Sequence, residues 1–194
     1  MDNRLEEYLE THETIRNPIA NALGISRATL ARLVATGELQ RVAQGIYARA
    51  DSLPDELATI AGRSPRVVFS HETALALHGL HNRIPEMPTI TVPTGCPTPR
   101  SILHLVKTYR VKPERHDLGR TVVRSFQGQD VPCYDAERTI CDIIRSYSRV
   151  DIETYTNALR SYARFPSRNI PLLMEYARRL GIEGKVSRTL EVLI

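Results

Sequence analysis

Histidine and glutamate residues between positions 71 and 78 are the first candidates for metal chemistry. His71 is followed directly by Glu72, and His78 comes seven positions after His71. The two histidine ligands of a metalloprotease helix lie four residues apart, and a third ligand comes from elsewhere in the chain. The separation of seven does not fit that pattern. We therefore expect no metal here, and we expect His78, next to Gly79, to interact with the end of its helix.

Two other patterns suggest enzyme chemistry, and both are weak. Residues 183–185, Glu-Gly-Lys, match the end of a nuclease motif, but Gly181 and Gly184 bracket them and predict a turn instead of a core strand. No Gly-rich phosphate loop is present, and no serine or cysteine has a suitable histidine partner. The three cysteines lack CxxC spacing and are odd in number, which indicates reduced thiols. We predict no catalytic residue, no metal and no cofactor, and a nuclease-like enzyme is the least favoured alternative.

Arginine is the residue that points to a partner. The net charge is only +4, but lysine occurs at three positions alone, so the cations are nearly all guanidinium groups. Guanidinium binds phosphate and guanine with two parallel hydrogen bonds. Residues 1–13 hold five acids, whereas residues 14–49 hold a single acid, Glu38, and five arginines. A basic segment therefore begins near residue 14.

Two short helices are predicted in this segment, with a tight turn between them. Asn17 is expected to cap the first helix, with Pro18 at its first position, and Gly24 ends it. Ser26 is expected to cap the second helix, which Gly37 ends. The second helix carries apolar residues at core spacing: Leu30, Leu33 and Val34.

After the second helix the sequence pattern changes to the two-residue period of a strand. Residues 41–49 are predicted to form two short β runs around a Gly-containing turn. Two helices with a tight turn, followed by a basic hairpin, predict a winged helix-turn-helix whose second helix enters the DNA major groove. Helical spacing puts Ala28, Arg32 and Ala35 opposite the apolar stripe, where Arg32 can bind a guanine. Arg41 and Arg49, at the hairpin ends, are expected to contact phosphates. The predicted DNA-binding residues are Ser26, Arg27, Ala28, Thr29, Arg32, Arg41, Gln44 and Arg49. The alternative is a small helical subdomain with solvated arginines.

The remaining chain is predicted to form an α+β domain after a polar linker at residues 51–55. We assign residues 1–53 to the DNA-binding domain and residues 54–194 to the larger mixed α/β domain, which ends in helices. Strands are expected at residues 66–69, 89–92, 103–109, 121–126 and 131–134. Helices are expected after Asp135 and Asp151 and at residues 170–180, with a short final helix. Asp135, Arg138 and Asp142 favour a cap and an ion pair over contact with DNA.

A second set of arginines lies in the predicted C-terminal helices: Arg160, Arg164, Arg168, Arg178 and Arg179. These residues form either a solvated helix face or a second contact surface, for DNA or for a protein partner, and the sequence favours neither. The N-terminus is acidic and has no apolar segment of signal-peptide type, so we expect a cytoplasmic protein with no membrane contact.

Three blocks in order resemble the AbiEi antitoxins of bacterial type IV toxin–antitoxin systems, which are also abortive phage infection proteins. The blocks are residues 23–47, residues 70–93 (beginning Ser-His-Glu-Thr-Ala-Leu) and residues 131–142 (Val-Pro-Cys-Tyr-Asp-Ala-Glu-Arg-Thr-Ile-Cys-Asp). The resemblance implies an autorepressor whose winged helix binds double-stranded DNA at promoter inverted repeats. It also implies a larger domain that counters a nucleotidyltransferase toxin, in a protein that is monomeric in solution and cooperative on DNA. A stand-alone winged-helix regulator without a toxin is the alternative.

Overall fold

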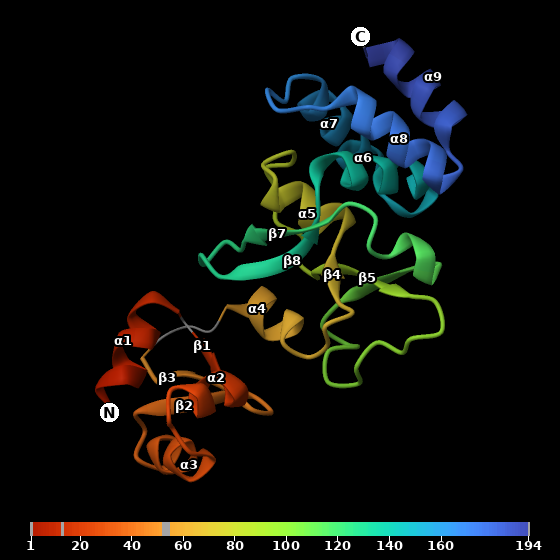
Figure 1. The fold of residues 1–194 in the computed structure, drawn as a ribbon. Helices are drawn as coiled ribbons and strands as arrows, with labels where there is room; N and C mark the ends of the chain where they lie inside the picture. Colours follow the sequence, from red (N-terminus) through yellow and green to blue (C-terminus); the bar gives the residue numbers. More distant parts are fainter. Residues whose placement is uncertain (1, 13, 52–54, 194) are drawn as a thin grey trace. The chain divides into compact units, whose positions relative to one another are not determined.

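The computed structural model describes residues 2–12, 14–51 and 55–193 (Figure 1). The chain divides into two compact units. The N-terminal unit is Met1–Gly62 with the segment Ser125–Asp130, and the C-terminal unit is Arg63–Arg124 with Val131–Ile194. We describe each unit by itself.

The N-terminal unit combines helices with a three-stranded antiparallel sheet of order β1-β3-β2 (Figure 1). Its elements are α1 (Asn3–Thr11), β1 (Thr14–Arg16), α2 (Asn17–Ala22), α3 (Arg27–Ala35), β2 (Leu39–Ala43), β3 (Ile46–Arg49) and α4 (Glu56–Ala61). In β1, Ile15 lies opposite Tyr47 of β3, and in β2, Arg41 lies opposite the same tyrosine. The order of helix, strand, two helices and hairpin is that of a winged helix-turn-helix.

Side chains at helical spacing hold the helices of this unit to its sheet. Leu5 and Leu9 bury one face of α1, and Leu30 and Leu33 bury one face of α3. All four belong to one apolar core together with Ile15 of β1. Sequence patterning missed α1, although Asp2 accepts a hydrogen bond from the Arg4 N–H as its N-cap.

One predicted cap is wrong. Asn17 is the first residue of α2, and Arg16 occupies the N-cap position without a side-chain bond. The backbone N–H of Asn17 instead donates to the Gly45 carbonyl at 3.0 Å, which ties the start of α2 to the hairpin turn. Gly45 has φ +73°, and a Cβ atom there would lie 2.8 Å from Asn17 Nδ2. The turn thus favours glycine for its backbone conformation, and a side chain there would also displace the Asn17 amide.

The C-terminal unit is built on a five-stranded mixed sheet of order β6-β5-β4-β8-β7. Its strands are β4 (Val68–Phe69), β5 (Thr89–Pro93), β6 (Lys107–Val111), β7 (Arg120–Arg124) and β8 (Asp130–Tyr134). Strand β4 pairs antiparallel with β5 and parallel with β8, and β5 pairs parallel with β6. The strand expected at residues 103–109 therefore begins later than predicted. Residues 101–105 form turns, in which the Leu105 N–H donates to the Ile102 carbonyl.

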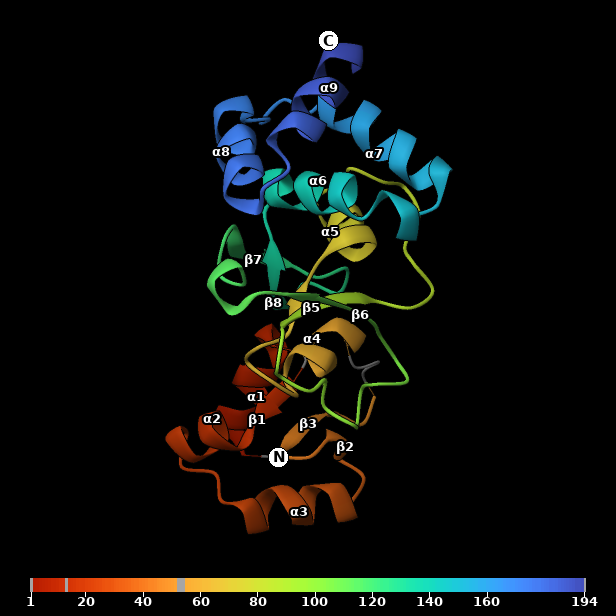
Figure 2. The same cartoon turned by 90° about the vertical axis from the view of Figure 1, so that its right-hand side faces the viewer.

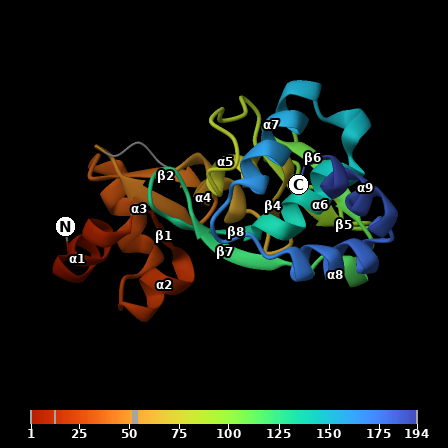
Figure 3. The ribbon, with the colours of Figure 1, turned by 90° about the horizontal axis from the view of Figure 1, so that it is seen from above.

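Helices cover one face of this sheet in two layers. They are α5 (His71–Leu77), α6 (Ala136–Arg145), α7 (Ile152–Ala163), α8 (Ile170–Leu180) and α9 (Glu183–Leu193), with short 3₁₀ turns η1 (Pro113–Arg115) and η2 (Tyr147–Arg149). Figure 2 shows α5 and α6 next to the sheet and the last three helices beyond them. Figure 3 shows α7 and α8 on either side of α6. The core lies between these helices and includes Ile140, Ile143, Ala158 and Leu173.

The predicted caps of α6 and α7 are correct. Asp135 accepts from the Arg138 N–H at 2.7 Å, and Asp151 accepts from the Thr154 N–H at 2.8 Å. Residues 183–185 form the first turn of α9 instead of the expected loop turn, because Gly181, with φ +74°, already ends α8. These residues are on no strand, so the nuclease motif lacks its required setting.

The predicted fold class is confirmed: an N-terminal winged helix-turn-helix precedes a mixed α/β region that ends in helices. The predicted domain boundary falls at residues 53 and 54, which lie outside the described residues. The compact N-terminal unit continues through α4 to Gly62, and it includes the hydrogen bond between Asp55 and Ser125. Within the described residues, no helix has the length and apolar character needed to cross a membrane.

Candidate nucleic-acid interface

Helix α3 presents a face of small residues and arginines to solvent. Arg27, Ala28, Ala31, Arg32 and Ala35 are all exposed. The buried stripe of Leu30 and Leu33 lies on the other side of the helix. Alanine side chains permit close approach of the helix backbone to base edges, and a long arginine between them can reach a guanine.

The start of α3 is fixed by two hydroxyl side chains. Ser26 Oγ accepts from the Thr29 N–H at 3.1 Å, and the two hydroxyl oxygens lie 2.9 Å apart. Both side chains are therefore engaged with each other and with the helix end. These bonds fix the N-terminal boundary of the helix that carries Arg27 and Arg32. The side chains of these arginines form no hydrogen bond or ion pair with the described part of the chain.

The wing arginines differ from each other. Arg41 is exposed on β2 and has no side-chain partner among the described residues. Arg49 forms a bidentate ion pair with Asp51. Its Nε donates to Oδ1 at 3.0 Å, and its Nη2 donates to Oδ2 at 3.1 Å. The pair raises the pKa of Arg49 and lowers the pKa of the Asp51 carboxyl, chiefly through this side-chain hydrogen bond. Gln44 is exposed in the hairpin turn. Of the two predicted phosphate ligands, Arg41 is available and Arg49 is already neutralised.

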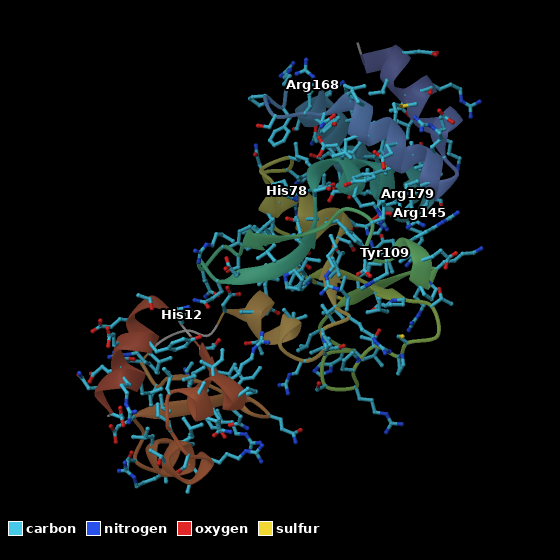
Figure 4. All side chains as sticks on the ribbon, viewed as in Figure 1. His12, His78, Tyr109, Arg145, Arg168 and Arg179 are labelled. Atoms are coloured by element: carbon cyan, nitrogen blue, oxygen red, sulfur yellow. The ribbon has the colours of Figure 1, made fainter. Side chains whose placement is uncertain are left out.

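The structure does not bring the five C-terminal arginines together. Arg160 and Arg164 lie at the end of α7, whereas Arg178 and Arg179 lie at the end of α8, on the other side of α6 (Figure 3). Arg178 pairs with Glu183 at 3.4 Å and Arg179 with Glu175 at 3.8 Å. Figure 4 shows Arg168, which precedes α8, far from Arg179. The side chains of Arg160 and Arg164 have no ion-pair partner among the described residues.

The polar residues of the middle segment serve the fold. Arg138 and Asp142 are both completely buried and form an ion pair at 3.0 Å, so Arg138 cannot reach DNA, as expected. His78 Nε2 lies 2.7 Å from the Tyr134 carbonyl oxygen. His71 is fully buried and stacks on Tyr109 with ring centroids 3.4 Å apart. Burial lowers the pKa of His71 to about 3.

No group of three His, Cys, Asp or Glu side chains in the described ranges is arranged to hold a metal ion. Figure 4 labels two of these residues, His78 at the end of α5 and Tyr109 on β6. The arrangement of His71, His78 and Tyr109 provides packing and hydrogen bonds inside the unit. The candidate nucleic-acid surface is the exposed face of α3 together with Arg41 of the wing.

Comparison with known proteins agrees with the geometry of the N-terminal unit. Residues 3–50 match a family model described as "Transcriptional regulator, AbiEi antitoxin". The AbiEi match begins at α1 and ends just after β3, so it spans the whole winged helix. It confirms the resemblance inferred from the sequence for this part of the chain.

One solved structure is similar over nearly the whole chain. It is the crystal structure of the RV2827C protein from Mycobacterium tuberculosis, with a TM-score of 0.56 and 14% sequence identity. The alignment covers 98% of this chain and 79% of that chain. At this identity the similarity shows a shared fold. No curated protein matches the chain.

Proposed function

We propose that the protein is the antitoxin and transcriptional autorepressor of a type IV toxin–antitoxin system. In this proposal the winged helix binds inverted repeats in the promoter of its own operon, and the C-terminal unit counters a nucleotidyltransferase toxin. The single observation that carries the DNA-binding part is the solvent face of α3, where Arg27 and Arg32 are exposed beside alanines and their side chains form no hydrogen bond or ion pair with the described residues. The family match adds the regulatory and antitoxin roles.

We assign base recognition to Arg32 and phosphate contact to Arg41. Arg32 is in the middle of the exposed face, next to Ala28 and Ala35, where the helix can enter the major groove. Arg41 is on the wing, where a cation meets the sugar–phosphate backbone. We give Arg49 a smaller role because Asp51 already neutralises it. Ser26 and Thr29 position the helix start, and Ala28 and Gln44 line the contact.

The test is DNA binding by three arginine variants of the full chain, measured on the promoter of its own gene and on unrelated DNA. Arg32→Ala should lose about 1–3 kcal/mol of specific binding and relax the preference at one base pair. Arg41→Ala should weaken binding to both DNAs alike and reduce the salt slope by about 0.9. Arg49→Ala is the matched control on the same hairpin and should change the slope less. If Arg32→Ala lost the same binding free energy on both DNAs, base recognition by Arg32 would be ruled out.

Arg160 and Arg164 are proposed as a second anchor, for DNA or for the toxin, because their side chains, at the end of α7, have no ion-pair partner in the part of the chain that the structure describes. A cationic pair on a helix end attracts phosphate at long range. Arg178 and Arg179 are less suited to this role since each has a carboxylate partner. No catalytic step is assigned to any residue. A stand-alone regulator without a toxin uses the same N-terminal surface, and the genes beside this one distinguish the two cases.

A further inference from the structure

The C-terminal unit contains a cavity to which no function has been assigned above. Its volume is about 690 Å³, and it lies between α7, α9 and the end of α6. Cavities of roughly 300–1,000 Å³ are typical of small-molecule sites. The lining residues are Ile144, Tyr147, Tyr155, Thr156, Leu159, Arg160, Lys185, Arg188 and Thr189.

The floor of the cavity is apolar and carries an aromatic pair. Ile144 and Leu159 are buried side chains of the main core, so the floor is fixed by packing. Tyr147 and Tyr155 meet edge to face, with ring centroids 4.9 Å apart and planes at 82°. Tyr147 remains 54% exposed, so part of its ring is accessible to a ligand. Aromatic rings stack on one another, so a ligand with a flat ring can pack against the exposed part of Tyr147.

The walls of the cavity carry three cations and no acid. Arg160 comes from α7, and Lys185 and Arg188 come from α9, so charge of one sign faces the cavity from two helices. Their side chains form no hydrogen bond or ion pair within the described ranges. By contrast, Arg178 and Arg179 on α8 are both paired. Three unpaired cations around an apolar floor call for an anion that also has an apolar part.

A second cavity nearby does not share this character. Its volume is about 470 Å³, and its lining mixes Arg83 and Arg164 with Asp151 and Glu153. With Arg160 the lining holds three arginines, but the two carboxylates offset two of these charges, so an anion gains less there. Arg160 lines both cavities, whereas Lys185 and Arg188 line only the larger one among those two.

We propose that the larger cavity binds an organic anion with a flat ring, of the chemical class of nucleoside phosphates. The ring packs on Tyr147 over the apolar floor, and the phosphates lie among Arg160, Lys185 and Arg188. The volume favours a small molecule over a peptide helix, which needs a longer groove for anchors on successive turns. This site is independent of the winged helix, so its existence does not rest on the proposed function.

Calorimetric titration of the full chain with ATP tests the proposal, with adenosine and inorganic tripolyphosphate as half-ligands. ATP should bind more tightly than either half-ligand because only ATP supplies both ring and charge. Lys185→Ala and Arg188→Ala should each weaken ATP binding about tenfold, which equals ~1.4 kcal/mol. Tyr147→Leu should weaken ATP and leave tripolyphosphate unchanged. Arg179→Ala is the matched control, since it removes one charge from the same unit away from the cavity.

Three outcomes overturn the proposal. The first is an absence of ATP binding at millimolar concentration. The second is equal affinity for ATP and tripolyphosphate with no effect of Tyr147→Leu, which is general attraction of polyanions. The third is that Arg179→Ala weakens ATP binding as much as Lys185→Ala and Arg188→Ala, which is attraction by the net charge of the unit and not binding in the cavity. Circular dichroism of each variant shows whether it is folded.

Discussion

Replacing Arg138 by methionine removes the most heavily bonded buried charge of the C-terminal unit. Arg138 Nε donates to Asp142 Oδ2 at 3.0 Å, and its Nη1 donates to the carbonyls of Arg115 and Leu118 at 2.9 and 2.6 Å. The guanidinium lies over the Tyr134 ring, 4.1 Å from the centroid. Methionine fills a similar volume but makes none of these polar contacts.

The expected loss follows from what the substitution leaves behind. Asp142 stays completely buried with one cation, because Arg145 Nη2 still donates to its Oδ1 at 2.8 Å. Two carbonyls of the loop before β7 also lose their donor. Breaking a buried pair typically costs about 3–5 kcal/mol. Since Arg145 remains, we expect the lower part of that range, about 3–4 kcal/mol of the free energy of unfolding.

Urea-induced unfolding of the full chain, followed by tyrosine fluorescence, measures this loss. Six of the eight tyrosines lie in the C-terminal unit, and only Tyr8 and Tyr47 lie in the N-terminal unit. The fluorescence signal therefore reports mainly the C-terminal unit. Arg145→Met is the matched control: its side chain is 24% exposed, and it should cost about 1 kcal/mol. The double variant with Asp142→Leu should regain part of the loss, because no buried charge stays unpaired. An equal cost for Arg138→Met and Arg145→Met would refute the reasoning.

Two further predictions concern pH and the separability of the units. Burial keeps His71 neutral in the folded protein, with its pKa lowered from 6.5 to about 3, while Asp142 acts in the opposite direction. The unfolded state therefore binds the extra proton, and stability falls as pH decreases from 6.5 towards 3, by up to ~1.4 kcal/mol per pH unit. Urea unfolding at several pH values should show a shallower dependence in His71→Phe, and no change in the control His104→Gln, whose side chain is exposed. An unaltered slope in His71→Phe contradicts the buried-histidine account. Separately, a fragment of residues 1–62 should fold and bind the promoter weakly, with a smaller salt slope than the full chain if Arg160 or Arg164 contacts DNA. This fragment should not protect cells from the toxin, and protection would assign neutralisation to the N-terminal unit.

Local signals accounted for the parts of the fold that were predicted well. Ser26, Asp135 and Asp151 each cap the helix expected of them, because a short polar side chain bonds the backbone within three residues. Residues 170–180 form a helix with the predicted bounds, since an Asn-Ile-Pro start and a glycine end are both local. The start of α2 was misassigned at Asn17 because its backbone partner, the Gly45 carbonyl, is distant in sequence.

The candidate DNA surface was also largely predictable, because helical spacing alone separates Leu30 and Leu33 from Arg32. The ion pair between Arg49 and Asp51 was not predicted, although the two residues are close in sequence. The spacing of two alone does not show that both side chains turn to the same side after β3 ends. Only the geometry at the strand end makes Arg49 a poor phosphate ligand.

The sequence by itself determined the order of the winged helix, the basic character of its segment and the caps of the later helices. These features depend on neighbours within about one helical turn or one hairpin. The tertiary structure decided which arginines are free. Arg138 is buried beside Asp142, Arg178 and Arg179 are paired, and the cations of α7 and α9 meet around one cavity. Charge counts cannot distinguish these cases. The arginine ion pairs join residues two to five apart, but the burial of Arg138 and the grouping of cations from α7 and α9 depend on how segments distant in sequence pack together.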